Sequence, residues 1–165
     1  MSLALPPGIT RDGEGVGGVV WNVLGHTYWL KAECESCFIF GTLDPPGTFV
    51  PPHVHPTQDE FIWVLDGTID LILDGQKHQA KPGDLVRMPM GIPHGYFNNG
   101  STPARAVFWV TPARRLRALF DALHNLTDPA EVVRSLLDPV IWKDAALETV
   151  IAMADARAII ADLKD

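Results

Sequence analysis

From residue 19 to residue 111, short apolar and β-branched runs alternate with tight-turn signals such as Asp66-Gly67 and Asp74-Gly75. Runs of about four to eight residues with this composition are typical of β-strands. In chain order they are VVWNVL, HTYWLK, CFIFGTL, TFVPPHV, EFIWVLD, TIDLILD, KHQA, DLVRM, HGYFN and ARAVFWV. So many short strands at close spacing predict an all-β antiparallel sandwich or barrel, with a hairpin over TIDLILDGQKHQA.

After residue 111 the apolar positions change to a helical period. They predict an amphipathic helix within 112–123, which we expect to pack against the outside of the barrel or a partner subunit. Asp128 followed by Pro129 indicates the cap and first residue of a second helix, and the alanine-rich stretch 145–163 favours further helix. The apolar positions of the first helix are Leu116, Leu119, Phe120 and Leu123.

These patterns divide the chain of 165 residues into three segments. Residues 1–18 are rich in Gly and Pro without a period, which predicts a flexible N-terminal arm. Residues 19–111 form the predicted β-barrel domain. Residues 112–165 form a C-terminal helical extension that is too short to build a core of its own. We therefore expect one domain with appendages.

Composition and charge narrow the range of partners. With 47% hydrophobic and 20% charged residues, the chain has the composition of a soluble globular protein. The formal net charge of -7 argues against a nucleic-acid partner, which needs a basic face. The sequence contains no apolar run long enough to span a bilayer and no secretory signal pattern. We expect a cytoplasmic protein whose partners are small molecules or other protein chains.

Cys34 and Cys37 form a C-x-x-C pair. Such pairs bind zinc or take part in thiol exchange, but a zinc site would need two further ligands at suitable spacing. A thioredoxin-like motif would open a helix, whereas Cys37 leads into the strand-like run FIFGTL. We interpret the pair as two free, partly buried thiols at a strand entrance.

A candidate metal site lies in the stretch GTFVPPHVHPTQDEFIWVLDG. On an extended strand, His53 and His55 point to the same face. After a short turn, a strand beginning near Glu60 can fold back and carry its carboxylate to the same place. His94, in GDLVRMPMGIPHGYFN, supplies a fourth ligand. Three imidazoles and one carboxylate suit one divalent ion of iron, manganese, nickel, cobalt, copper or zinc; the alternative is that these are ordinary buried or surface histidines.

The two stretches resemble the two motifs of the cupin superfamily. The first motif is matched by Gly47, His53, His55, Glu60 and Gly67, and the second by Gly83, Pro89, Gly91, His94 and Asn98. The resemblance implies a cupin jelly-roll β-barrel with the metal on the two histidines, the glutamate and the third histidine of these motifs. The stretches PPHVHPTQDEFIWVLDG and PARAVFWVTPA look like the small single-domain cupins of the quercetin dioxygenase-like group.

Two functions from different classes are compatible with this resemblance. One is a metal-dependent dioxygenase, in which Glu60 accepts a proton from a small aromatic or enolisable substrate and dioxygen is the second substrate. The alternative is a non-redox cupin, either a small-molecule or sugar-binding sensor or an isomerase-like Lewis-acid enzyme. We also predict a homodimer. An exposed strand edge such as that of VVWNVL must be paired or covered, and the resemblance to cupins implies the same.

Strand alternation also predicts which side chains form the walls of the substrate pocket. Phe49 is expected on the face of the first two histidines, Ile62 and Val64 on the face of Glu60, and Tyr96 on the face of His94. For Ile62 and Val64, an ordinary place in the barrel core is the alternative.

Overall fold

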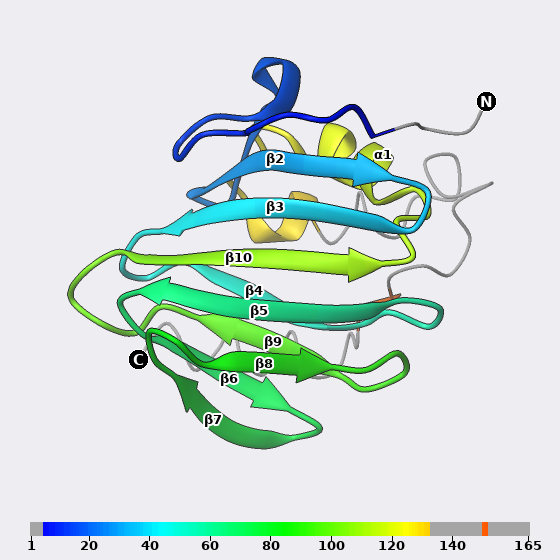
Figure 1. The fold of residues 1–165 in the computed structure, drawn as a ribbon. Helices are drawn as coiled ribbons and strands as arrows, with labels where there is room; N and C mark the ends of the chain where they lie inside the picture. Colours follow the sequence, from blue (N-terminus) through cyan, green and yellow to red (C-terminus); the bar gives the residue numbers. More distant parts are fainter. Residues whose placement is uncertain (1–4, 133–149, 152–165) are drawn as a thin grey trace.

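The computed structural model describes residues 5–132 and 150–151, and two antiparallel sheets make up most of this part (Figure 1). The first sheet contains, in spatial order, β1 (Val20–Val23), β2 (His26–Cys34), β3 (Cys37–Asp44), β10 (Ala104–Thr111), β5 (Asp59–Asp66) and β8 (Leu85–Met88). The second contains β11 (Val150–Ile151), β4 (Phe49–Val54), β9 (His94–Phe97), β6 (Ile69–Leu73) and β7 (Gln76–Ala80). The predicted all-β jelly roll is confirmed, and β6 and β7 pair as the expected hairpin.

The strands form because their side chains alternate between the space enclosed by the two sheets and the outside. In β10, Ala104, Ala106, Phe108 and Val110 are buried, and the residues between them are partly exposed. Burying a large apolar side chain contributes about 1.5–3 kcal/mol, so the register of each strand is fixed by its inward face. The core therefore lies between the sheets, where it also encloses the polar residues described below.

The helix α1 (Leu116–Leu123) closes one side of the barrel. It begins later than position 112 because Arg114 has a positive φ of 50°, which interrupts a helical path. Its four apolar positions are all buried, as the spacing predicted. Phe120 carries much of this contact, since its ring centroid lies 5.1–5.8 Å from those of four barrel aromatics. These are Trp21 at 5.2 Å, Tyr28 at 5.1 Å, Phe38 at 5.8 Å and Phe40 at 5.1 Å.

The expected second helix begins as predicted, because Oδ1 of Asp128 accepts a hydrogen bond from the backbone N–H of Ala130 at 2.9 Å. Most of the helix predicted over 145–163 lies outside the described residues. Val150 and Ile151 are described, and there the prediction is wrong. They form β11, which pairs antiparallel with Val54 and His53 at the edge of the second sheet. This pairing satisfies backbone hydrogen-bonding groups at the edge of β4. The pattern of residues 145–163 could not reveal that this edge would be available for pairing.

The segment before β1 contacts the first sheet. Thr10 donates its hydroxyl to the carbonyl of Lys31, and the Lys31 ammonium group donates to the carbonyls of Arg11 and Glu14. A short 3-10 turn, η1 (Val16–Gly18), then leads into β1. The domain boundaries drawn at residues 18 and 111 stay predictions. Over the described residues, no helix combines the length and apolar character that a bilayer crossing requires.

Candidate metal centre

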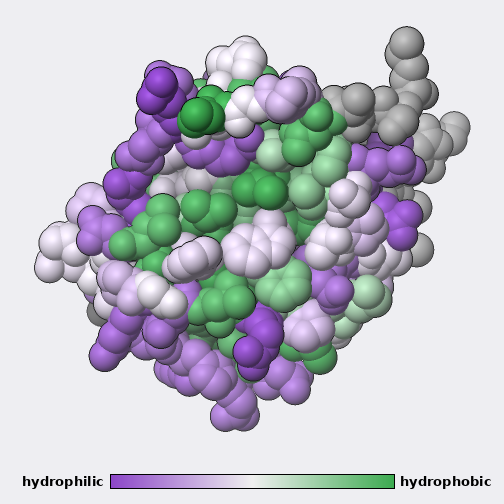
Figure 2. Space-filling view, in the orientation of Figure 1, coloured by the Kyte–Doolittle hydropathy of each residue, from purple (hydrophilic) through white to green (hydrophobic). Residues whose placement is uncertain are grey.

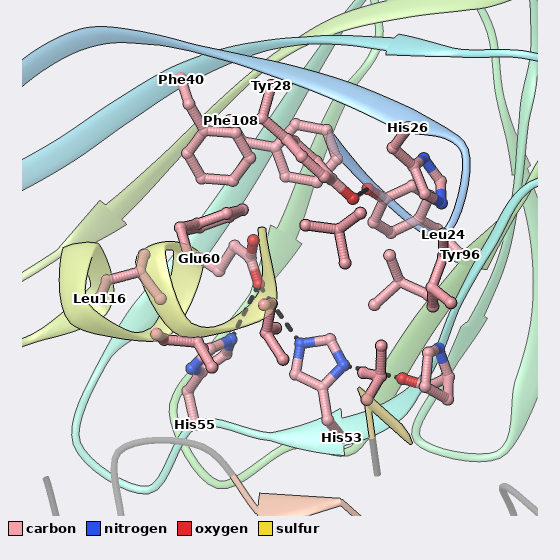
Figure 3. A pocket seen from close by; sticks show the side chains of 17 residues that line it. Leu24, His26, Tyr28, Phe40, His53, His55, Glu60, Tyr96, Phe108 and Leu116 are labelled. Atoms are coloured by element: carbon pink, nitrogen blue, oxygen red, sulfur yellow. Dashed lines mark hydrogen bonds and ion pairs between the residues drawn. The ribbon is translucent and has the colours of Figure 1, made fainter. Parts of the chain in front are cut away.

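Four side chains with metal-binding atoms meet between the two sheets. Figure 3 shows His53, His55 and Glu60 of this set pointing toward one another. His53 in β4 lies directly opposite His94 in β9, and His55 follows the end of β4. Glu60 reaches them from β5 in the other sheet. The ligand atoms of all four residues lie within 4.8 Å of one another. The structure therefore brings together the four residues proposed as metal ligands from the sequence.

Backbone contacts determine which nitrogen of two of these rings carries the proton. Nδ1 of His53 lies 2.9 Å from the carbonyl oxygen of Pro51, and Nδ1 of His94 lies 2.9 Å from that of Ile92. A carbonyl oxygen only accepts hydrogen bonds, so both Nδ1 atoms are the donors. In the neutral rings, Nε2 then carries a lone pair that points into the cluster, as in histidines that bind metals.

The Nε2 atoms converge on one carboxylate oxygen. Oε2 of Glu60 lies 3.0 Å from Nε2 of His94, 3.2 Å from that of His55 and 4.0 Å from that of His53. Lone pairs of an anionic oxygen and neutral ring nitrogens repel one another at such distances unless a cation or a proton lies among them. A mixed set of three nitrogens and one oxygen suits first-row divalent metals, so the residues present fit such an ion.

The environment favours the protonation states that metal binding requires. Burial, with the neighbouring His94 and His55, lowers the pKa of His53 to about 3, so this ring is neutral near pH 7. Burial alone would raise the pKa of Glu60. In the metal-free cluster, protons held between Oε2 of Glu60 and the rings of His55 and His94 outweigh burial and hold the pKa of Glu60 well below its ordinary value; a bound metal ion would take the place of these protons. A neutral imidazole and an ionised carboxylate are the forms that coordinate metals.

The cluster opens onto a pocket whose walls are mainly apolar (Figure 3). Besides His53, His55 and Glu60, its lining consists of Val23, Leu24, His26, Tyr28, Phe40, Val50, Pro51, Tyr96, Phe108, Leu116, Leu119, Phe120, Leu123 and Val132. The inward face of α1 supplies four of these side chains, so the helix forms one wall. The sequence analysis predicted the apolar face of this helix but not that it covers the candidate metal centre.

Two buried tyrosines add a polar feature to this wall. Their hydroxyl oxygens, on Tyr28 and Tyr96, lie 3.1 Å apart. Burial raises the pKa of both phenols well above the usual value, so both keep their protons near pH 7. Each hydroxyl carries one proton, and the hydrogen bond between them involves only one of the two. The second proton is therefore available to donate to a ligand.

His26 is a pocket residue that the sequence analysis did not single out. Its Nδ1 lies 2.6 Å from Oδ1 of Asp44, and its Nε2 lies 3.1 Å from the carbonyl oxygen of Phe49. With both ring nitrogens in contact with the buried Asp44 carboxyl group and the Phe49 carbonyl, the His26 ring is held in place by the protein itself. Its ring stacks on Tyr28. The alternation of His26, Tyr28 and Leu30 on the inward face of β2 was the available signal.

The expected wall residues have different outcomes. Tyr96 lines the pocket, but Phe49 does not, because β4 contains a register shift between Val50 and His53. The extra residue at Pro51–Pro52 reverses the alternation, so Val50 takes the place expected for Phe49. Phe49 instead stacks on the ring of Phe97, with centroids 6.5 Å apart.

Ile62 and Val64 also do not line the pocket. Both are fully buried on the inward face of β5, the face of Glu60. Ile62 is paired with Phe108 of β10, and the large Phe108 ring forms the pocket lining at this level. The alternation prediction placed these residues on the correct face but at the wrong depth, and they belong to the barrel core.

Comparison with known proteins agrees with this geometry. The protein-family model described as the cupin domain matches residues 42–111 of this chain. This range contains all four candidate ligands. Protein SchB from Streptomyces halstedii is 33% identical over 96 residues, covering 58% of this chain and 67% of SchB. The chain belongs to the cupin family. Within this cupin, the matched range starts in β3 and ends with β10.

Two further relatives indicate the breadth of the likeness. Quercetin 2,3-dioxygenase from Bacillus subtilis (strain 168) is 44% identical over 94 residues, which are 54% of this cupin but only 27% of that enzyme. Among solved structures, KdgF from Halomonas sp. superimposes with a TM-score of 0.60 at 18% identity, covering 68% of this chain and 99% of KdgF. The second likeness concerns the fold alone.

Proposed function

We propose that this cupin is a metal-dependent dioxygenase that acts on a small aromatic or enolisable substrate. One divalent transition metal per chain would be held by His53, His55, Glu60 and His94. The observation that carries the proposal is that these ligands open directly onto a pocket lined by aromatic and aliphatic side chains. The alignment with quercetin 2,3-dioxygenase, although it spans only a part of that enzyme, supports the same class of reaction.

The residues of the chain have separate roles in this proposal. The metal, when bound, supplies Lewis-acid and redox chemistry. Glu60 lines the pocket and accepts the proton of a substrate hydroxyl or enol. The proton left over in the Tyr28–Tyr96 pair is donated to a second oxygen of the substrate. The apolar side chains of α1 exclude water from the reacting atoms.

The pocket favours this reaction class over a sugar isomerase. A sugar presents many hydroxyl groups, and each one that enters an apolar site without a hydrogen-bond partner costs free energy. Away from the metal ligands, the polar groups of the lining are His26, Tyr28 and Tyr96. The ring nitrogens of His26 are already bonded within the protein. A flat, mostly apolar molecule with one or two oxygens satisfies such a wall better than a sugar does.

Oxygen consumption tests the proposal. Protein loaded separately with iron, manganese and nickel would be mixed with small phenols and β-diketones in an oxygen-electrode cell. With at least one of these metals, we expect oxygen to be consumed in fixed proportion to the substrate. The His78→Ala variant should keep this oxygen uptake, and the His94→Ala variant should lose it. His78 is an exposed histidine of β7 and serves as the matched control. Compounds that bind every loaded form without oxygen uptake would favour the non-redox alternative.

We also propose that the protein works as a homodimer in the cytoplasm. Support for the dimer comes from the outer face of the first sheet, where Figure 2 shows apolar side chains gathered. On it, Trp63, Leu65 and Leu85 are 52%, 47% and 48% exposed, which is unusual for large apolar residues so close together. Light scattering tests this proposal, since a stable monomer mass at high concentration would contradict it.

A further inference from the structure

The two cysteines lie at the end of a hairpin, away from the pocket lining. Cys34 ends β2 and Cys37 begins β3, and the two are paired directly across a turn that contains only Glu35 and Ser36. Their Sγ atoms lie 3.5 Å apart, and both residues are partly exposed. Directly opposed residues of antiparallel strands have Cα atoms about 4.5–5.5 Å apart, within the range that a disulfide spans.

The surroundings make the two thiols unequal. Hydrogen bonds with Ser36 and Cys37 lower the pKa of Cys34 to about 7, so a large fraction of this group is thiolate near neutral pH. Burial raises the pKa of the Cys37 thiol. Such a pair has a ready nucleophile at one position and a protonated second thiol at the other.

A metal site is a poorer interpretation of this pair. A bound zinc ion would need two more ligands beside the two sulfurs. In residues 5–132, where side chains are described, the one group of three or more potential ligands is the cluster between the sheets, and neither cysteine belongs to it.

We propose that Cys34 and Cys37 form a redox-active thiol pair that low-molecular-weight disulfides oxidise reversibly. The Cys34 thiolate attacks one sulfur of the small disulfide, forms a mixed disulfide and releases the first thiolate. The Cys37 thiol then loses its proton, and its sulfur attacks Sγ of Cys34 and releases the second. Two protein thiols are oxidised to one disulfide, while one small disulfide is reduced to two thiols. This chemistry is independent of the proposed oxygenase reaction.

The position of the turn connects this pair to the pocket. The hydroxyl of Thr111 donates to the carbonyl of Ser36 at 2.9 Å, and the N–H of Ala113 donates to the carbonyl of Glu35 at 3.4 Å. Both donors belong to the segment that leads from β10 into α1, the helix that covers the pocket. Closing the disulfide draws the ends of the turn together, so we expect it to change the hydrogen bond that protects the amide of Ala113.

Mass spectrometry of the intact folded protein tests the thiol chemistry, with glutathione disulfide as the oxidant and glutathione as the reductant. We expect the wild type to lose two hydrogens and to regain them with glutathione. Cys37→Ser should stop at the mixed disulfide and keep the mass of one glutathione. Cys34→Ser should react at least about tenfold more slowly, because the accessible thiolate is gone. Thiols that persist in folded wild type, or disulfides between chains, would overturn the proposal.

Hydrogen exchange tests the connection to α1. The Ala113 amide should exchange at a different rate in the oxidised and reduced proteins, by about threefold or more. The Gly91 amide, which bonds to the carbonyl of His55, is the internal control and should not change. Equal exchange rates at Ala113 in both forms would overturn the proposed connection between the cysteine turn and α1. The thiol chemistry is tested separately by the mass spectrometry above.

Discussion

The Nε2 atom of His94 lies 3.0 Å from the Oε2 atom of Glu60, although the two residues belong to different sheets. An ion bound by both would therefore tie the sheets together as well as support chemistry. Any ligand that binds the folded chain and not the unfolded chain stabilises the fold by mass action. Metal occupancy and resistance to unfolding should rise together in this protein.

We predict about one divalent ion per chain when the protein is purified without chelators. Elemental analysis would measure it, with His78→Ala as the control for a histidine that does not contribute. Wild type that holds no metal, and takes none up from added iron, nickel or zinc, would contradict the assignment of this site. The identity of the metal is left open by the ligand set, which accepts most first-row ions.

Substitution of Glu60 and of His94 should separate two roles. Glu60→Gln keeps an oxygen near the metal but removes the proton acceptor, so much of the metal should remain while turnover falls by about 10² or more. His94→Ala removes a nitrogen ligand and leaves a hole, so metal affinity itself should fall, and the metal-dependent stability with it. Metal titration and turnover on an identified substrate measure the two effects.

Two outcomes would contradict these roles. If Glu60→Gln loses metal as completely as His94→Ala, the carboxylate acts mainly as a ligand. If Glu60→Gln keeps both metal and full turnover, Glu60 is not the proton acceptor.

Acid should destabilise the metal-free protein. The pKa of His53 is about 3 in the folded chain against an ordinary value of 6.5, so below pH 6.5 the unfolded chain binds more protons. Stability should therefore fall as pH drops from 6.5 towards 3, by up to about 1.4 kcal/mol per pH unit for this group. The depressed pKa of Glu60 acts in the same direction below 4.5.

Urea unfolding in the presence of EDTA, between about pH 7.5 and about pH 4, would measure this dependence. His53→Gln should unfold with a shallower pH slope than the wild type, because the titrating ring is absent. A slope unchanged by that substitution would assign the acid sensitivity to other groups.

The buried pair of His26 and Asp44 should be costly to break. Asp44→Asn replaces one of the carboxylate oxygens that contact His26 and Thr42 with an NH2 group, so one of these buried partners loses its acceptor and we expect a loss of about 1–3 kcal/mol in the free energy of unfolding. Asp74→Asn, at the exposed turn between β6 and β7, should change stability by less than about 0.5 kcal/mol. Denaturant unfolding of the two variants side by side tests this, and equal stabilities would show that the pair has little energetic weight.

Hydrophobic alternation and turn dipeptides were sufficient to predict the strands of the barrel. The apolar residues of each inward face form a local sequence pattern, and their burial stabilises the strand. The four candidate ligands could be predicted for a related reason. Their spacing, together with the glycines and prolines around them, specifies two strand ends that face each other. His53 opposite His94 is the result of that register.

The pocket wall was less accessible to sequence reasoning. Phe49 was misplaced because a bulge at Pro51–Pro52 shifts the register by one residue, and an alternation count cannot detect an extra residue. His26 was missed because its partner Asp44 comes from another strand. Val150 and Ile151 were misassigned to a helix because their pairing with β4 depends on an edge that only the assembled sheet exposes.

The chain keeps the metal ligands and one wall of the pocket in separate stretches of sequence. The ligands lie between His53 and His94, whereas α1 supplies its wall from Leu116 to Leu123. Changes in the helix can therefore alter the shape and size of the molecules admitted without moving any ligand atom. A barrel built this way can acquire new substrates while its reactive centre stays the same.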